Sequence, residues 1–119
     1  MKCQNAIKYF LQNIFYINKE IIGWAKIWIE KLKNGETVSF TPRGNSMSPR
    51  IESGQLVIVQ PIQDFEVGDI VLCKVNGCEY LHLIKAIQGN RVQIGNNKGK
   101  INGWTTINQI YGKCIKIDR

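Results

Sequence analysis

The chain has 119 residues, of which 44% are hydrophobic and 21% are charged, with only three prolines. This composition excludes a disordered or fibrous chain, and the length is that of one domain with a single core. Sixteen Lys and Arg against nine Asp and Glu give a formal net charge of +7, which predicts affinity for anionic surfaces without specifying their kind.

The first 36 residues carry apolar side chains at helical spacing. One set is Ile7, Phe10, Leu11, Ile14 and Phe15, and the next is Ile21, Trp24, Ala25, Trp28 and Leu32. We therefore predict one or two N-terminal α-helices in a segment spanning 1–36, with Asn34-Gly35 as the C-terminal stop. The tryptophan stripe suits either a partner-binding or membrane-surface face or packing onto a following sheet, which is the commoner use.

After residue 36 the apolar period changes to two, which is typical of strands. The predicted strands are Thr37–Thr41, Gln55–Gln60, Asp69–Val75, Cys78–Ile87, Arg91–Ile94 and Tyr111–Ile117. The turn Asn76-Gly77 is a strong hairpin signal. We predict a mostly β fold, a small barrel-like or two-sheet domain spanning 37–119.

Four cysteines stand at positions 3, 73, 78 and 114. A two-residue hairpin loop pairs Cys73 with Tyr80 rather than with Cys78, so these two cysteines are out of register for a disulfide. The single histidine adds nothing to a zinc site. We therefore expect reduced cysteines, no metal or cofactor, and a cytoplasmic location. The charge-free stretch from Tyr9 to Asn18 is too short for the roughly 20 apolar residues of a membrane span.

The loop Arg43-Gly-Asn-Ser-Met-Ser-Pro49 is unusual because a small hydroxyl, Ser46, is followed at once by an apolar residue. A rigid turn of this kind can present one side chain and aim backbone N–H groups at a developing oxyanion, although most such loops are ordinary turns. A serine nucleophile needs a base, and the only histidine, His82, lies in a strongly apolar predicted strand. Strand alternation places His82 and Lys85 on opposite faces unless a bulge intervenes.

Five boxes occur in a fixed order: Gly44-Asn-Ser-Met-Ser-Pro49, Ser53-Gly-Gln-Leu-Val-Ile-Val59, Val67-Gly-Asp-Ile-Val71, Leu81-His-Leu-Ile84 and Ile94-Gly-Asn-Asn97. This order resembles the signal peptidase and LexA-like (S24/S26) serine peptidase superfamily over roughly residues 37–117. The resemblance implies that Ser46 is the nucleophile and His82 the general base, as in the histidine branch; other branches use lysine. Asn96 stands where that branch has an acid, which implies an amide that orients the imidazole without adding charge. Asp69 matches a structural turn of the family.

The resemblance implies a serine endopeptidase that acts on a polypeptide substrate and needs no cofactor. Self-cleaving LexA-type repressors fit poorly, because no Ala-Gly or Cys-Gly bond precedes Ser46. Membrane signal peptidases fit no better without an anchoring helix, so we expect a small, soluble, cytoplasmic member.

The alternative is a weakly active or inactive binding module on the same scaffold, which recognises peptide or nucleic acid through a basic surface. Residues 80–117 contain six bases and no acid: Lys85, Arg91, Lys98, Lys100, Lys113 and Lys116. Such a run binds phosphates or another anionic surface, or is an ordinary solvated face.

Overall fold

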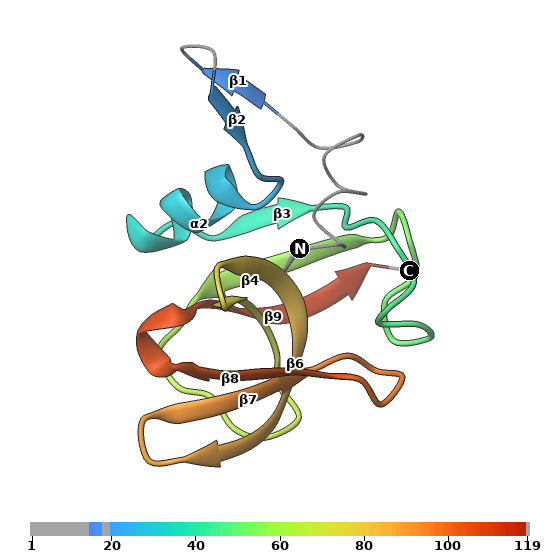
Figure 1. Cartoon of the computed structure of the whole chain (residues 1–119). Coiled ribbons are helices and arrows are strands. Elements are labelled where there is room, and N and C mark those ends of the chain that lie inside the picture. Colours follow the sequence, from blue (N-terminus) through green and yellow to red (C-terminus); the bar gives the residue numbers. More distant parts are fainter. Residues whose placement is uncertain (1–14, 18–19, 119) are drawn as a thin grey trace.

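The computed structural model describes residues 15–17 and 20–118. They form a two-stranded hairpin, an α-helix and a seven-stranded antiparallel sheet (Figure 1), which confirms the mostly β prediction. The elements are β1 (Phe15–Ile17), β2 (Glu20–Ile22), α2 (Lys26–Lys33), β3 (Val38–Phe40), β4 (Leu56–Pro61), β5 (Ile70–Val75), β6 (Cys78–Gln88), β7 (Arg91–Gly95), β8 (Ile101–Thr106), the 3-10 turn η1 (Ile107–Gln109) and β9 (Ile110–Asp118).

The segment before the sheet differs in part from the predicted helices. Residues 1–14 of the first apolar set lie outside the described residues. The strands β1 and β2 pair antiparallel, with Tyr16 opposite Ile21, where helical spacing had predicted a helix. Only the later part of the second set is helical: α2 contains Trp28 and Leu32 and buries Ile29 and Leu32, while Ile21 lies in β2 and Trp24 and Ala25 precede the helix. The helix ends as predicted, since Gly35 follows with a φ of 85°.

The two tryptophans of the second set pack onto the sheet, as the commoner reading of the stripe predicts. Trp28 stacks on Phe40 of β3, with ring centroids 5.3 Å apart. Trp24 is buried and lies 5.9 Å from the same ring. The helix is therefore fixed to the edge of the sheet by aromatic contacts.

The sheet has the strand order β3-β4-β9-β5-β6-β7-β8. In the β5–β6 hairpin, Cys73 pairs with Tyr80, Lys74 with Glu79 and Val75 with Cys78, which is the predicted register. The long strand β6 bends across the molecule (Figure 1) and pairs with β5 on one side and β7 on the other. Strand β8 was not predicted.

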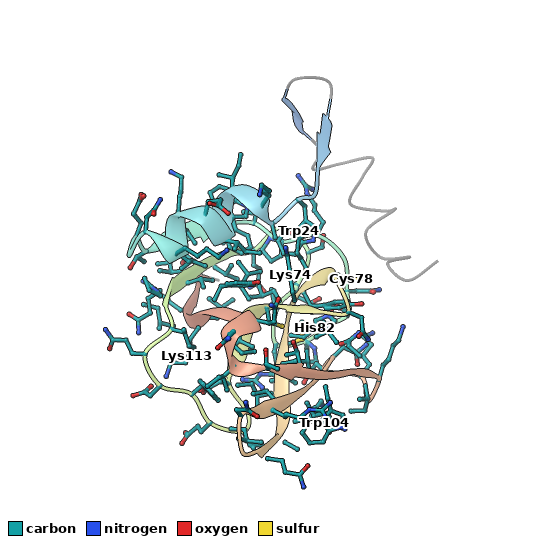
Figure 2. All side chains as sticks on the ribbon, turned by 60° about the vertical axis from the view of Figure 1, so that its left-hand side comes forward. Trp24, Lys74, Cys78, His82, Trp104 and Lys113 are labelled. Carbon is teal, nitrogen blue, oxygen red and sulfur yellow. The ribbon has the colours of Figure 1, made fainter. Side chains whose placement is uncertain are left out.

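The core consists of two clusters that meet at β6. The first joins α2, β3, β4 and the loop after β3 to Leu81 and Leu83 of β6. The second includes Ile84 of β6 and residues of β5, β7 and β9. His82 lies on β6 between Leu81 and Leu83 of the first cluster, and Figure 2 shows it near the centre of the molecule. Its position is thus set by well-packed neighbours on both sides along the strand.

The cysteines differ from the expectation that all four are reduced. Cys73 and Cys114 are free, and burial raises the pKa of both thiols. Cys78, however, is disulfide-bonded, and Cys3 lies outside the described residues. The prediction is wrong for Cys78, so reduced cysteines no longer support a cytoplasmic location.

Over residues 15–17 and 20–118 there is no helix whose length and apolar character would let it cross a bilayer.

Candidate active site

The loop between β3 and β4 carries Ser46, and apolar side chains of the loop anchor it in the core. Met47 and Ile51 are buried in the first core cluster, and the Ile51 N–H donates to the Met47 carbonyl at 3.0 Å. Gly44 adopts a φ of 100°, a conformation that side chains disfavour. These constraints hold Ser46 half-buried at the surface of the loop.

Asn97 ties this loop to the β7–β8 connection. Its backbone N–H donates to the Ser46 carbonyl at 3.0 Å, and its side-chain amide donates to the Ser48 carbonyl at 2.9 Å. The carbonyls on both sides of Met47 are thereby fixed from a distant part of the chain. The Ser46 hydroxyl is positioned by both its own loop and the sheet.

Ser46 and His82 meet as predicted. The Ser46 Oγ lies 3.0 Å from the His82 Nε2, and the imidazole side chain is buried, with an exposed fraction of 5%. This distance is within hydrogen-bond range, which is the separation that proton transfer from a serine hydroxyl to a histidine requires.

The second imidazole nitrogen contacts a residue that sequence reasoning missed. Asn102 of β8 places its Oδ1 2.7 Å from the His82 Nδ1. An amide oxygen only accepts hydrogen bonds, so this contact favours the tautomer with the proton on Nδ1, in which Nε2 can accept the Ser46 hydroxyl proton. This is the tautomer that a histidine base requires.

The structure thus places Asn102, rather than the predicted Asn96, against the ring. The Asn96 Oδ1 accepts hydrogen bonds from the backbone N–H groups of Lys98 and Lys100, at 2.8 and 2.9 Å. Asn96 therefore shapes the β7–β8 connection and does not orient the imidazole.

The sequence pattern did not identify Asn102 because this residue lies in a β-bulge. Ile94 pairs with Gly103 and Gly95 with Ile101, so Asn102 is the extra residue of β8 and its side chain is re-aimed. In the sequence, Asn102-Gly103 has the form of a turn. The only contrary signal was the strand-forming run Trp104-Thr-Thr106 that follows.

The electrostatic surroundings keep His82 neutral near neutral pH. Burial lowers its pKa below the usual 6.5, and the cations of Lys100 and Lys85 lower it further, while the hydrogen bond with Asn102 acts in the opposite direction. A neutral imidazole with a free Nε2 is the form that can accept a proton.

Lys85 occupies a second bulge. Ile84 pairs with Ile94 and Ala86 with Gln93, so Lys85 has no partner across the ladder and simple alternation does not fix its direction. Even so, the side chain within hydrogen-bond distance of Ser46 is that of His82.

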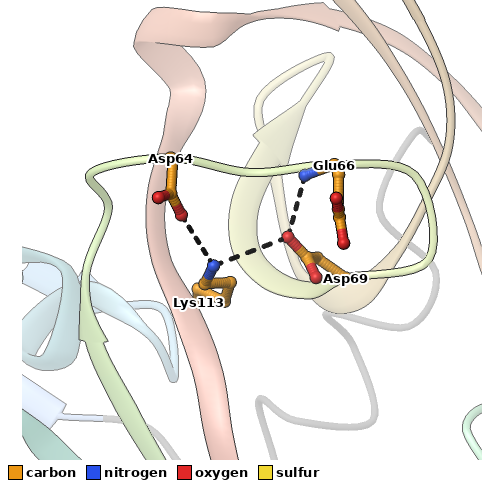
Figure 3. Close-up of polar contacts among 4 residues, drawn as sticks. All are labelled: Asp64, Glu66, Asp69 and Lys113. Carbon is orange, nitrogen blue, oxygen red and sulfur yellow. Dashed lines mark hydrogen bonds and ion pairs between the residues drawn. The ribbon is translucent and has the colours of Figure 1, made fainter.

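Asp69 and Lys113 belong to a structural ion cluster (Figure 3). The Lys113 Nζ lies 2.9 Å from the Asp64 Oδ1 and 3.8 Å from the Asp69 Oδ2, and the latter oxygen accepts the Glu66 N–H. The Ile84 N–H donates to the Asp69 carbonyl at 2.9 Å. The turn at Asp69 therefore supports β6 two residues from His82, in line with the structural role that the resemblance implied.

The predicted basic surface is consequently smaller than the sequence indicated, because Lys113 is neutralised by carboxylates. Of the other bases, Lys98, Lys100 and Lys116 are exposed, and Lys85 is half-buried. Arg91 is also exposed and lies over the Trp104 ring, 5.8 Å from its centroid.

A curled β domain in which a loop serine meets a buried strand histidine has the form of a serine-peptidase-like domain. The family model for Peptidase S24-like matches residues 6–100. The chain therefore belongs to the Peptidase S24-like family, which confirms the superfamily resemblance. The match includes Ser46 and His82 and ends before Asn102. A search of curated proteins finds no match to the chain.

Proposed function

We propose that the protein is a serine endopeptidase that cleaves a polypeptide with a Ser46–His82 dyad. The observation that carries this proposal is the continuous chain of contacts from Asn102 through the imidazole to the Ser46 hydroxyl, at 2.7 and 3.0 Å. It supplies a nucleophile, a neutral base and a group that fixes the base's tautomer.

The chemistry follows from the positions of the protons. As the Ser46 Oγ attacks the scissile carbonyl carbon, its proton moves to the His82 Nε2. The resulting imidazolium then gives this proton to the leaving amine, the C–N bond breaks, and an acyl-serine ester remains. Water, deprotonated by the same nitrogen, hydrolyses the ester and restores the hydroxyl. We expect the backbone N–H of Ser46 to donate a hydrogen bond to the oxyanion that forms during the attack.

Asn102 orients the ring but contributes no charge. In a site whose nearest ionic influences on His82 are the cations of Lys100 and Lys85, the imidazolium intermediate is stabilised less than beside an aspartate. We therefore expect slow acylation rather than none.

The test is covalent labelling with a fluorophosphonate, followed by intact-mass spectrometry. Wild type should gain one phosphonyl group, and Ser46→Ala and His82→Ala should gain none. Ser48→Ala is the matched control, because it removes a hydroxyl from the same loop and should still be labelled. A folded wild-type protein that gains no label would refute the peptidase proposal and leave the binding module.

A further inference from the structure

Three lysines beside the proposed dyad have no carboxylate partner. Lys98 and Lys100 belong to the β7–β8 connection and are exposed, and Lys85 lies in the bulge of β6 and is half-buried. None of the ion pairs among the described residues includes any of the three. Their ammonium groups are therefore available to bind an anion from outside the chain.

Hydrogen bonds join the β7–β8 connection to the nucleophile. The Asn97 N–H donates to the Ser46 carbonyl at 3.0 Å. The preceding residue, Asn96, is bonded to Lys100 in both directions: its N–H donates to the Lys100 carbonyl at 2.9 Å, and its Oδ1 accepts the Lys100 N–H at 2.9 Å. The backbone of Lys100 is thereby fixed relative to the loop of Ser46.

The side chain of Lys85 reaches the same connection. A Cβ placed on Gly95 would lie 2.9 Å from the Lys85 Cε and 2.6 Å from the Lys100 carbonyl oxygen. The end of the Lys85 side chain thus passes over Gly95, next to Lys100. Both cations also lower the pKa of His82, as expected of charges that flank the dyad on the side of the β7–β8 connection.

Neighbouring carboxylates do not pair with these lysines. Residues 80–117 contain no acid. The carboxylates of Asp64 and Asp69 are engaged in the structural ion cluster, and Glu52 of the nucleophile loop is bonded to the Ser48 hydroxyl. An anionic ligand would therefore meet a favourable electrostatic potential beside the dyad.

We propose that the site recognises an acidic polypeptide, with Asp or Glu side chains near the scissile bond that Lys85 and Lys100 select. This substrate class rests on the proposed peptidase function. A polypeptide fits better than a nucleic acid because the cations adjoin groups suited to a peptide bond. The exposed aromatic that a base would need, Trp104, is covered on one face by Arg91, which lies at the other end of β7, about 13 Å along the strand from Gly95.

The test uses two acetylated and amidated hexapeptides that differ only in charge, EEAAEE and QQAAQQ. The first readout is the NMR signal of the His82 ring, the only histidine in the sequence, at about pH 8, where the imidazole is neutral. EEAAEE should shift this signal with a Kd about tenfold lower than QQAAQQ, the worth of two ion pairs at a protein surface. About 0.5 M NaCl should remove most of the difference.

The second readout is protection of Ser46 from the fluorophosphonate, which EEAAEE should give at about tenfold lower concentration than QQAAQQ. The fluorophosphonate carries no carboxylate, so labelling itself does not depend on the lysines.

Lys85→Gln and Lys100→Gln should each reduce the preference for EEAAEE about threefold, and the double variant should abolish it. Lys116→Gln is the matched control, because it removes the charge of another exposed lysine, on β9. It lowers the net charge by the same amount and should keep the wild-type preference.

Equal binding of the two peptides at His82 would overturn the proposal, as would an equal loss of preference in Lys116→Gln, which would assign the effect to net charge. An oligothymidylate that binds at His82 more tightly than EEAAEE would overturn it in favour of nucleic acid.

The two proposals fail separately, because the NMR readout needs no reaction at Ser46. Acylation of Ser46 without a preference between the peptides would refute the substrate class alone. Selective binding of EEAAEE at His82 in a protein that is never acylated would refute the peptidase function and support an acidic-peptide site.

Discussion

Replacement of Asn102 by aspartate converts the neutral partner of His82 into an anion at the same place. The contact is 2.7 Å between heavy atoms, which puts the centres of charge about 4 Å apart. At an effective dielectric constant of about 20 this attraction is worth about 4 kcal/mol. Allowing for the cost of desolvating the new carboxylate, we expect Asn102→Asp to raise the His82 pKa by about 1–3 units.

The measurement is an NMR titration of the single histidine. In wild type the midpoint should lie below the usual 6.5, because burial lowers the pKa, and in Asn102→Asp it should lie above it. The rate of Ser46 acylation should follow, with its acidic limb moved upward and a higher plateau, since the carboxylate stabilises the imidazolium.

Asn96→Asp is the control, because the sequence predicted that Asn96 orients the imidazole whereas the structure places Asn102 against it. A carboxylate at position 96 can still accept the N–H groups of Lys98 and Lys100, so the loop should persist, and the His82 pKa should move much less. A larger shift in Asn96→Asp than in Asn102→Asp would refute the assignment of Asn102 as the orienting residue.

Three further outcomes follow from the same contacts. Gly95→Ala should reduce the free energy of unfolding by about 1–3 kcal/mol in urea titrations, because a Cβ there would lie 2.6 Å from the Lys100 carbonyl oxygen; a variant as stable as wild type would contradict this packing. Asn97→Ala removes the donor to the Ser48 carbonyl, so it should lower the free energy of unfolding by about 1 kcal/mol and slow the acylation of Ser46. Unchanged labelling kinetics would show that this hydrogen bond does not position the Ser46 loop. The lowered His82 pKa means that the unfolded chain binds the proton first as pH falls. Stability should therefore be lost below about pH 6.5, and His82→Gln should lack that loss in thermal unfolding; an identical pH dependence in both would refute the burial of a neutral imidazole.

Much of the fold was accessible from local patterns. The Asn76-Gly77 turn was enough to predict the register of the β5–β6 hairpin, in which Cys73 pairs with Tyr80. The order of the family boxes was enough to bring Ser46 and His82 together, although 36 positions separate them.

What the sequence did not predict depends on tertiary pairing. The pairing of β7 with β6 skips Lys85, and its pairing with β8 skips Asn102, so each of these residues forms a bulge. No local sequence signal marks either bulge. The N-terminal hairpin was likewise concealed, since the apolar residues before α2 also fit a helical period. The misassigned orienting residue is a direct consequence: Asn102 faces His82 only because β8 is bulged.

The pH dependence of Ser46 acylation in wild type, His82→Ala and Lys85→Ala tests the Ser–His dyad most directly. The wild-type rate should rise along a single acidic limb with its midpoint below the usual histidine value of 6.5 and stay level from about pH 7 to 9. Lys85→Ala should keep most of that rate, and His82→Ala should show none at any pH. A rate that keeps rising into alkaline pH, persists without His82 and is lost in Lys85→Ala would contradict the account, because lysine would then be the base.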